Sequence, residues 1–88
     1  MKINPDFIKQ TIGEQRVVMA VGETTKTFNG ILYLNKTSEL LWDALQEQKT
    51  EADLAELLVS TYHIELSQAQ NDVKEFIGTL QQVSAIKD

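Results

Sequence analysis

Residues 30–45 constrain the fold of this chain most, because a strand pattern passes directly into a helix pattern there. Residues 31–34 form an unbroken run of apolar and aromatic side chains, which is typical of a strand. Leu41, Trp42 and Leu45 then recur at helical spacing and define one apolar helix face. The chain before this stretch has β-type patterns, and the chain after it has helical ones. The sequence therefore predicts an α+β domain.

Three strands are predicted in the N-terminal part of the chain. Phe7, Ile8 and Ile12 mark the first strand, and the β-branched run at residues 16–21 marks the second. The third strand spans residues 31–35. Short connections favour antiparallel pairing of neighbours, so we expect a three-stranded meander.

The connections between these strands carry turn signals. Residues 13–15 are predicted to form a turn, and the polar residues 22–27 a loop. Asn29-Gly30 indicates a second turn, because both residues tolerate positive φ. Residues 1–5 are expected to be a loose lead-in to the sheet.

The first two of three predicted helices follow the sheet. The first spans residues 37–48, with Asn35 or Thr37 as its N-cap, because either side chain can accept from the free N–H groups of the first turn. Thr50 followed by Asp53 resembles a capping box. The second helix should therefore start after Thr50 and end near residue 62.

The third predicted helix has the clearest amphipathic pattern of the chain. Ser67 and Gln70 resemble a second capping box at its start, and the helix should end near Val83. Strands followed by helices, without alternation, argue against a doubly wound parallel sheet. The apolar stripe of this helix consists of Ala69, Val73, Phe76, Ile77, Leu80 and Val83.

The composition argues against several functional classes. The chain has 8 basic and 13 acidic residues and a net charge of −5, so nucleic acid is not an expected partner. Cysteine is absent, and no apolar run approaches the ~20 residues of a membrane span, so we expect no membrane contact. The N-terminal stretch does not resemble a signal peptide, which favours the cytoplasm.

No catalytic constellation or cofactor motif stands out. The only histidine, His63, is expected to be structural or exposed, and a lone histidine without cysteine argues against a metal site. No glycine-rich phosphate loop is present. Trp42 could stack on a ligand, but its shared face with Leu41 and Leu45 favours the core.

The third strand has the greatest functional potential of the predicted elements. In a meander it lies at the edge of the sheet, and neither a charge nor a proline protects residues 31–34. An extended peptide could pair with this edge. A self-dimer or the N-terminal arm could equally cover it. Asp72, at the border of the apolar stripe, is either an ordinary acid favoured by the helix dipole or a group that accepts from a bound partner.

Four motifs follow one another along the chain. Phe28-x-Gly30-x-x-x-Leu34-Asn35 is followed by Leu41-Trp42-x-x-Leu45, by Thr50 ahead of a helix, and by Asp72-Val73-x-x-Phe76-x-x-x-Leu80. In this order and spacing the motifs resemble the PqqD family over nearly the whole chain. The resemblance implies one domain over residues 1–88 with a winged-helix-like fold, which agrees with a three-stranded antiparallel sheet followed by three helices.

The resemblance also implies a function. PqqD-like domains are non-catalytic peptide chaperones without a cofactor, which hold the leader segment of a ribosomally made precursor peptide and present it to a modifying enzyme, often a radical SAM enzyme. Such a leader adds to the third strand beside the third helix. By this resemblance the peptide-binding residues are Ile31, Leu32, Tyr33 and Leu34 on the strand, and Asp72, Val73 and Phe76 on the helix.

The chain departs from the family pattern after the third helix. Family members commonly have a glycine there, followed by two aliphatic residues, whereas this chain has Ser84-Ala85-Ile86. Serine is less favourable than glycine in a left-handed C-cap, so the sequence does not predict whether the C-terminal tail folds as in other family members.

Two alternative functions remain from the residues alone. A winged-helix DNA-binding regulator would fit the helix order, but it requires a basic recognition helix, and the third helix offers only Lys74. Absence of a gel shift with genomic DNA at low salt would exclude it. A small structural dimerisation domain would pair two strand edges, and a monomer by light scattering would count against that function.

Overall fold

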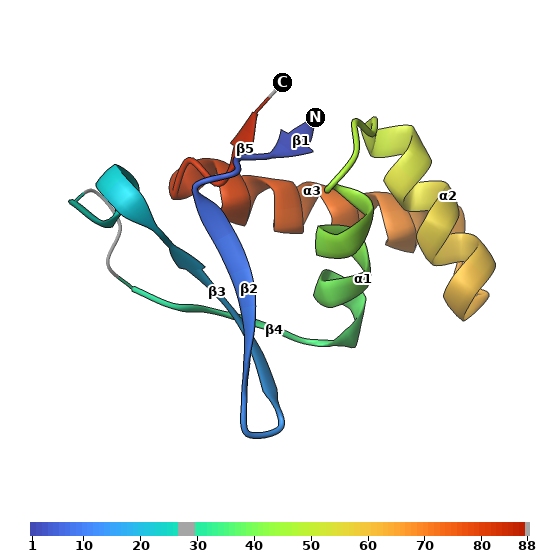
Figure 1. Cartoon of the computed structure of the whole chain (residues 1–88). Coiled ribbons are helices and arrows are strands. Elements are labelled where there is room, and N and C mark those ends of the chain that lie inside the picture. The colour runs from blue at the N-terminus through green and yellow to red at the C-terminus, as the bar shows by residue number, and fades with distance from the viewer. Residues whose placement is uncertain (27–29, 88) are drawn as a thin grey trace.

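The computed structural model describes residues 1–26 and 30–87 and shows a sheet followed by three helices (Figure 1). The sheet contains β2 (Phe7–Ile12), β3 (Gln15–Ala20) and β4 (Leu32–Leu34). The helices are α1 (Lys36–Ala44), α2 (Glu51–Tyr62) and α3 (Leu66–Gln82). The predicted α+β, winged-helix-like arrangement is confirmed. The predicted turn at Asn29-Gly30 lies mostly outside the described residues.

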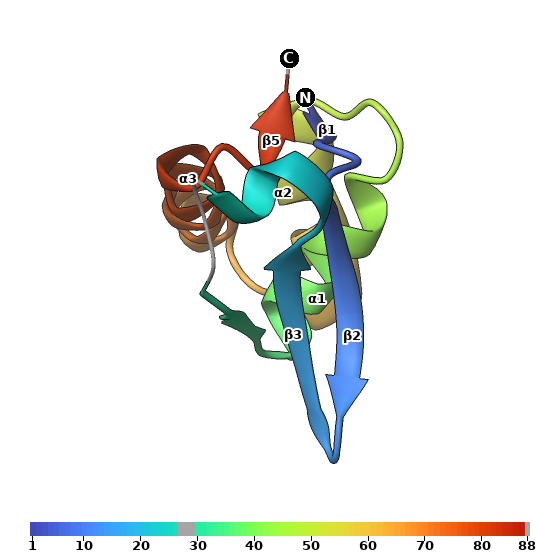
Figure 2. The same ribbon diagram turned by 60° about the vertical axis from the view of Figure 1, so that its left-hand side comes forward.

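A tight turn joins β2 and β3 and lets the hairpin project away from the helices (Figure 2). Ile12 pairs with Gln15, which leaves Gly13 and Glu14 as a two-residue loop. Gly13 has a φ of 62°, a conformation that glycine adopts at no steric cost. The predicted turn is thus confirmed at Gly13 and Glu14, whereas Gln15 already belongs to β3. The polar loop that follows β3 contains a short 3₁₀ helix, η1 (Gly22–Lys26).

β4 pairs with β3 alone and lies at one edge of the sheet. The strand order is β2-β3-β4, and all pairs are antiparallel, as the meander predicted. Within β4, Leu32 pairs with Val18, and Leu34 pairs with Arg16. Leu32 and Leu34 share the face that packs on the core, whereas Tyr33 points to the other face.

Asn35 ends β4 and starts α1, so the strand is shorter than predicted. The Asn35 side-chain oxygen accepts from the Ser38 backbone N–H at 2.8 Å, and the Ser38 hydroxyl accepts from the Asn35 N–H at 2.8 Å. This reciprocal capping box identifies Asn35, rather than Thr37, as the N-cap. It also fixes the angle between β4 and α1.

α1 is shorter than the helix predicted for residues 37–48. Its last regular residue is Ala44, and the chain continues through tighter turns in which Gln46 donates to the Asp43 carbonyl. Further along, the Lys49 N–H donates to the carbonyl of Met1 at 2.9 Å, a long-range contact with the N-terminal segment. The capping box of Thr50 and Asp53 then starts α2 as predicted.

The predicted cap of α3 is wrong. Ala69 N–H donates to the Glu65 carbonyl at 3.0 Å, so Glu65, two residues before Ser67, is the N-cap and the helix begins at Leu66. Glu65 makes no side-chain cap hydrogen bond. His63 ends α2 in the left-handed conformation with a φ of 56°, and its side chain is exposed.

The core lies between the sheet and the three helices. Trp42 is 2% exposed and belongs to this core together with Leu41 and Leu45, which confirms the structural interpretation of Trp42. The α3 stripe is also buried, apart from the half-buried Phe76 and Val83. The remaining α-helical core residues are Leu54, Ala55, Leu58, Ala69, Val73, Ile77 and Leu80.

The N-terminal segment is not a loose lead-in, because β1 (Lys2–Ile3) pairs with β5 (Ile86–Lys87). This antiparallel pair brings the first and last described residues together (Figure 1). Ile3 is buried in the core. The Asn4 side chain donates to the Ser84 carbonyl at 3.0 Å, and its oxygen accepts from the Asp6 N–H at 3.0 Å.

Ser84 closes α3 in the conformation that the family pattern assigns to glycine. Its φ is 61°, the Ser84 N–H donates to the Gln81 carbonyl, and the Ala85 N–H donates to the Leu80 carbonyl. These two bonds form a Schellman motif, with Ala85 packed in the core beside the end of the helix. The serine is therefore accommodated, and the tail continues into β5.

Replacing Ser84 with glycine is expected to raise the free energy of unfolding by about 0.5–1 kcal/mol, because glycine adopts positive φ without a clash of its Cβ. Urea denaturation followed by Trp42 fluorescence measures this change. Ser84→Ala retains the Cβ and is the matched control, for which we expect no gain. An unchanged midpoint in Ser84→Gly would show that this left-handed residue costs no stability.

Candidate functional site

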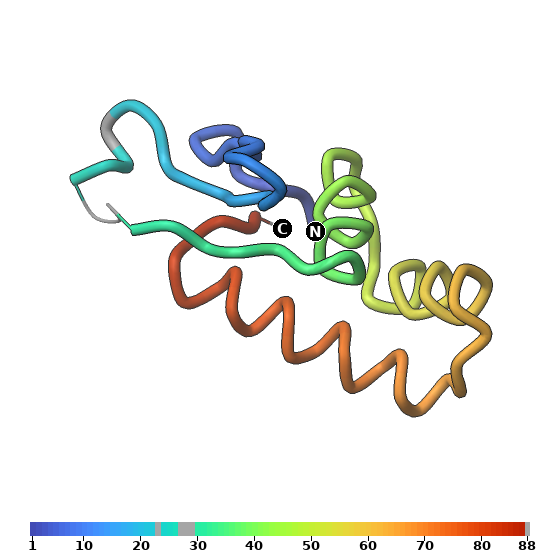
Figure 3. Tube along the Cα trace, turned by 90° about the horizontal axis from the view of Figure 1, so that it is seen from below, coloured from blue at the N-terminus to red at the C-terminus, as the bar shows by residue number. Residues whose placement is uncertain are grey.

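A cleft of about 340 Å³ lies between β4, the start of α1 and α3. In Figure 3, β4 lies between β3 and α3, and the strand and the helix run alongside each other. Because β3 occupies one edge of β4, the other edge faces this cleft. The lining residues are Leu32, Tyr33, Leu34, Asn35, Thr37, Ser38, Leu41, Asp72, Glu75, Phe76 and Thr79.

The strand side of the cleft is formed by β4. Leu32 and Leu34 are half-buried and pack against the core, so their positions are fixed. Tyr33 alternates with them, is 69% exposed and also contributes to the lining of the cleft. Within the described residues, the ladder of β4 involves only β3, so its second edge has no strand partner.

The helix side of the cleft is one face of α3. Asp72, Phe76 and Thr79 are four and three residues apart, and Glu75 lies beside them, so all four project from neighbouring turns. The Phe76 ring is half-buried against the core and supplies an apolar surface. The Gln68 amide donates to an Asp72 carboxylate oxygen at 2.8 Å and orients that carboxylate.

The first turn of α1 closes one end of the cleft. Thr37 and Ser38 bring hydroxyl groups to the lining, and Leu41 contributes an apolar side chain that is almost fully buried. The capping box between Asn35 and Ser38 holds this turn in place. The cleft thus combines apolar surface with polar groups at its margins, which is typical of a peptide-binding groove.

The structure brings together five of the seven residues that the sequence assigned to peptide binding. These are Leu32, Tyr33, Leu34, Asp72 and Phe76. Val73 is 1% exposed and supports α3 from the core, since it lies about 100° around the helix from Asp72. Ile31 precedes β4, is 44% exposed and lies outside the lining.

Sequence reasoning missed several lining residues. Glu75 and Thr79 lie three and seven residues after Asp72, and this helical spacing could have identified them. Thr37, Ser38 and Leu41 belong to a different helix, and no local pattern connects them with α3. Their place in the cleft depends on how α1 packs against the sheet.

A charge network on the hairpin side fixes α1 relative to the sheet. The Lys9 ammonium lies 2.7 Å from carboxylate oxygens of both Glu39 and Asp43, and Arg16 lies 3.5 Å from Glu39. Hydrogen bonds to Asp43 and Glu39 raise the pKa of Lys9, and the hydrogen bond from Lys9 lowers the pKa of Glu39. Both charges therefore persist over a wide pH range.

A separate carboxylate stabilises the start of α2. Hydrogen bonds from the Thr50 backbone and side chain lower the pKa of Asp53. Neither Asp53 nor the charge network of Lys9 lines the cleft. In the described part of the chain, no helix is long and apolar enough to cross a membrane, and no three acidic or histidine side chains group as metal ligands would.

The fold and the cleft define a small winged-helix-like domain with an open strand edge beside its longest helix. The model of the family "Coenzyme PQQ synthesis protein D (PqqD)" matches residues 15–86, and the chain belongs to this family. No curated protein matches the chain. A solved structure described as "TbiB1 in Complex with the TbiA(beta) Leader Peptide" has the same fold, with a TM-score of 0.78, 18% identity and full coverage of both chains.

Proposed function

We propose that this domain binds the leader segment of a ribosomally made precursor peptide as an added strand on β4. The observation that carries the proposal is the second edge of β4, which faces a cleft walled by α3. Membership of the PqqD family supports it. The structurally similar TbiB1 is described in complex with a leader peptide, which supports it further.

Strand addition suits the physical properties of this edge. A peptide paired with β4 would satisfy the backbone groups of both chains, and those bonds require no particular peptide sequence. Alternate side chains would point into the cleft, where the half-buried Phe76 of α3 offers apolar surface. Affinity would then come from the backbone ladder and selectivity from the cleft.

The proposed role is presentation rather than catalysis. By the family resemblance, the domain holds the leader while a modifying enzyme, of the radical SAM class, acts on the rest of the precursor. The chemistry belongs to that enzyme. Cytoplasmic localisation is part of the same proposal, because the precursor is a product of the ribosome.

An NMR titration tests the mode of binding. The leader peptide of a precursor gene beside the gene for this protein is added to isotope-labelled protein. We expect amide shifts at residues 31–34 and 72–80, because these segments flank the cleft. New protection of β4 amides from solvent exchange is also expected, since strand addition pairs them.

Variants at the two sides of the cleft provide the control. Tyr33→Ala and Asp72→Ala should each weaken binding of the leader. Glu56 is exposed on α2 and lies outside the cleft lining, so Glu56→Ala should leave binding unchanged. Unchanged binding in both cleft variants would overturn the proposal. Shifts confined to other surfaces would exclude strand addition on β4.

A further inference from the structure

We propose that the peptide recognised by this cleft carries a lysine or arginine that pairs with Asp72 and Glu75. This inference rests on the proposed function and specifies the chemical class of the peptide. Asp72 and Glu75 are the only charged residues among those that line the cleft within the described part of the chain. The groove therefore has a negative charge on its helix wall and no positive charge to neutralise it.

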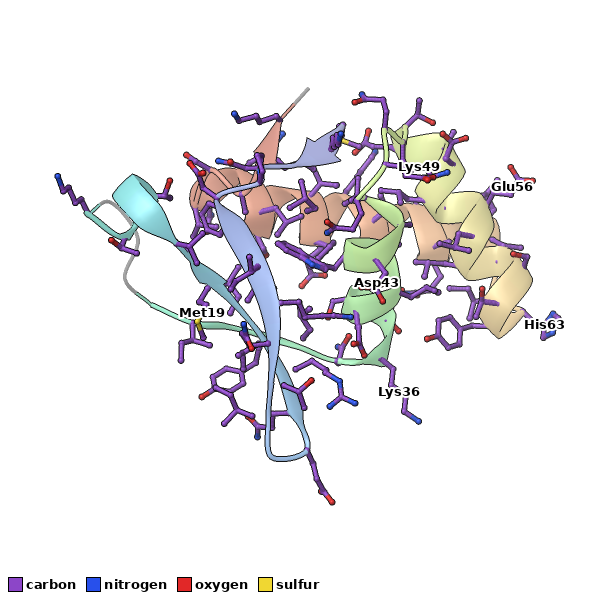
Figure 4. All side chains as sticks on the ribbon, in the orientation of Figure 1. Met19, Lys36, Asp43, Lys49, Glu56 and His63 are labelled. Carbon is purple, nitrogen blue, oxygen red and sulfur yellow. The ribbon has the colours of Figure 1, made fainter. Side chains whose placement is uncertain are left out.

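The nearby lysine side chains do not form ion pairs with these two carboxylates among the residues that the structure describes. Lys36 starts α1, and its side chain points away from the helix into solvent (Figure 4). Lys74 lies on α3 but outside the lining. In contrast to Glu39, which pairs with Lys9 and Arg16, neither Asp72 nor Glu75 belongs to an ion pair among the residues that the structure describes.

A bound peptide would remove water from both carboxylates. Asp72 is already half-buried, and its hydrogen bond from Gln68 supplies a neutral partner. Further desolvation without a cation is unfavourable, and an acidic peptide side chain at this point would add repulsion. A lysine or arginine would offset the lost hydration, so the wall should select a basic residue and reject an acidic one.

The dimensions of strand and helix fix where this basic residue lies. Side chains on the same face of a strand are about 6.6–6.8 Å apart, and four residues of a helix rise about 6 Å. A strand along α3 that places one inward side chain against Phe76 therefore places the next one near Asp72. The basic residue should be two positions from an apolar residue, and the order of the two depends on strand direction.

Selection from a phage-displayed library of random 12-residue peptides tests this inference. The wild-type protein and an Asp72→Asn/Glu75→Gln double variant are used as parallel targets. We expect peptides selected by the wild type to be enriched in lysine or arginine two positions from an apolar residue. The double variant should retain the apolar preference and lose the basic one.

A charge exchange separates ion pairing from a structural effect of Asp72. One selected peptide and its lysine-to-glutamate version are titrated by fluorescence anisotropy. Asp72→Asn should lower the affinity for the basic peptide by about fivefold. Asp72→Lys should reverse the preference between the two peptides, whereas Glu56→Lys on α2 should leave it unchanged. Loss of affinity for both peptides, without reversal, would overturn the inference.

The outcomes also separate this inference from the proposed function. Selected peptides that shift the amides of β4 and α3 but show no basic preference would overturn the inference and leave the proposed function intact. Selected peptides that all bind elsewhere would overturn both. A basic preference that persists in the double variant would show that other groups create it, and would also overturn the inference.

Discussion

Replacing Trp42 with alanine is expected to lower the free energy of unfolding by about 3–5 kcal/mol. Trp42 is 2% exposed in a core shared by the sheet and all three helices, so its removal leaves a cavity that the surroundings cannot fill. A small domain has a total stability of about 5–15 kcal/mol, so this loss is a large part of it. Thermal and urea denaturation followed by far-UV circular dichroism measure the change.

Tyr33→Ala is the matched control for this experiment. Tyr33 is also aromatic but is 69% exposed, so its truncation should cost about 1 kcal/mol or less. We therefore expect Trp42→Ala to lower stability, and Tyr33→Ala to lower leader affinity while stability stays close to that of the wild type. If Trp42→Ala unfolded at the wild-type midpoint and lost leader binding, the tryptophan would be a ligand contact and its assignment to the core would be wrong.

Replacing Thr79 with tryptophan is expected to weaken leader binding by about fivefold to 100-fold. Thr79 is exposed on α3 and lines the cleft, so a large ring there would occupy space needed by an added strand. Overpacking of this kind costs about 1–3 kcal/mol, and each 1.4 kcal/mol corresponds to about tenfold in affinity. Isothermal titration with the leader peptide measures the loss.

Gln70→Trp controls for the added ring. Gln70 is exposed on the same helix but does not line the cleft, so this variant should bind the leader as the wild type does. Both variants should unfold at nearly the wild-type urea midpoint, because neither side chain is buried. Full affinity in Thr79→Trp would mean that the leader does not occupy the space beside α3, and strand addition at this place would be excluded.

Much of the fold follows from interactions between residues close in sequence. Asn35 and Ser38, and likewise Thr50 and Asp53, are three residues apart, so the side chains that cap α1 and α2 are visible in the sequence. The apolar spacing of α3 and the unbroken apolar run of residues 31–34 are local patterns as well. Trp42 could be assigned to the core for the same reason, since it shares a helix face with Leu41 and Leu45.

The candidate site was predictable only in part. The edge position of β4 follows from a meander with short connections, and five of the seven proposed peptide-binding residues line the cleft. Local spacing could not separate Asp72, which faces the cleft, from Val73, which faces the core. That difference depends on which side of α3 packs against the sheet, a property of the tertiary structure.

The sequence by itself determined the order of elements, the cap of α2 and the amphipathic faces, and it narrowed the cap of α1 to Asn35 or Thr37, because hydrogen bonds and side-chain periodicity act over a few residues. The tertiary structure decided what depends on distant contacts. The Lys49 N–H, beyond the end of α1, donates to the Met1 carbonyl, and Ile3 pairs with Ile86, so both ends of the described chain form strands. The cleft has the same origin, because only packing of the sheet and helices brings β4 beside α3, with no described strand on its second edge.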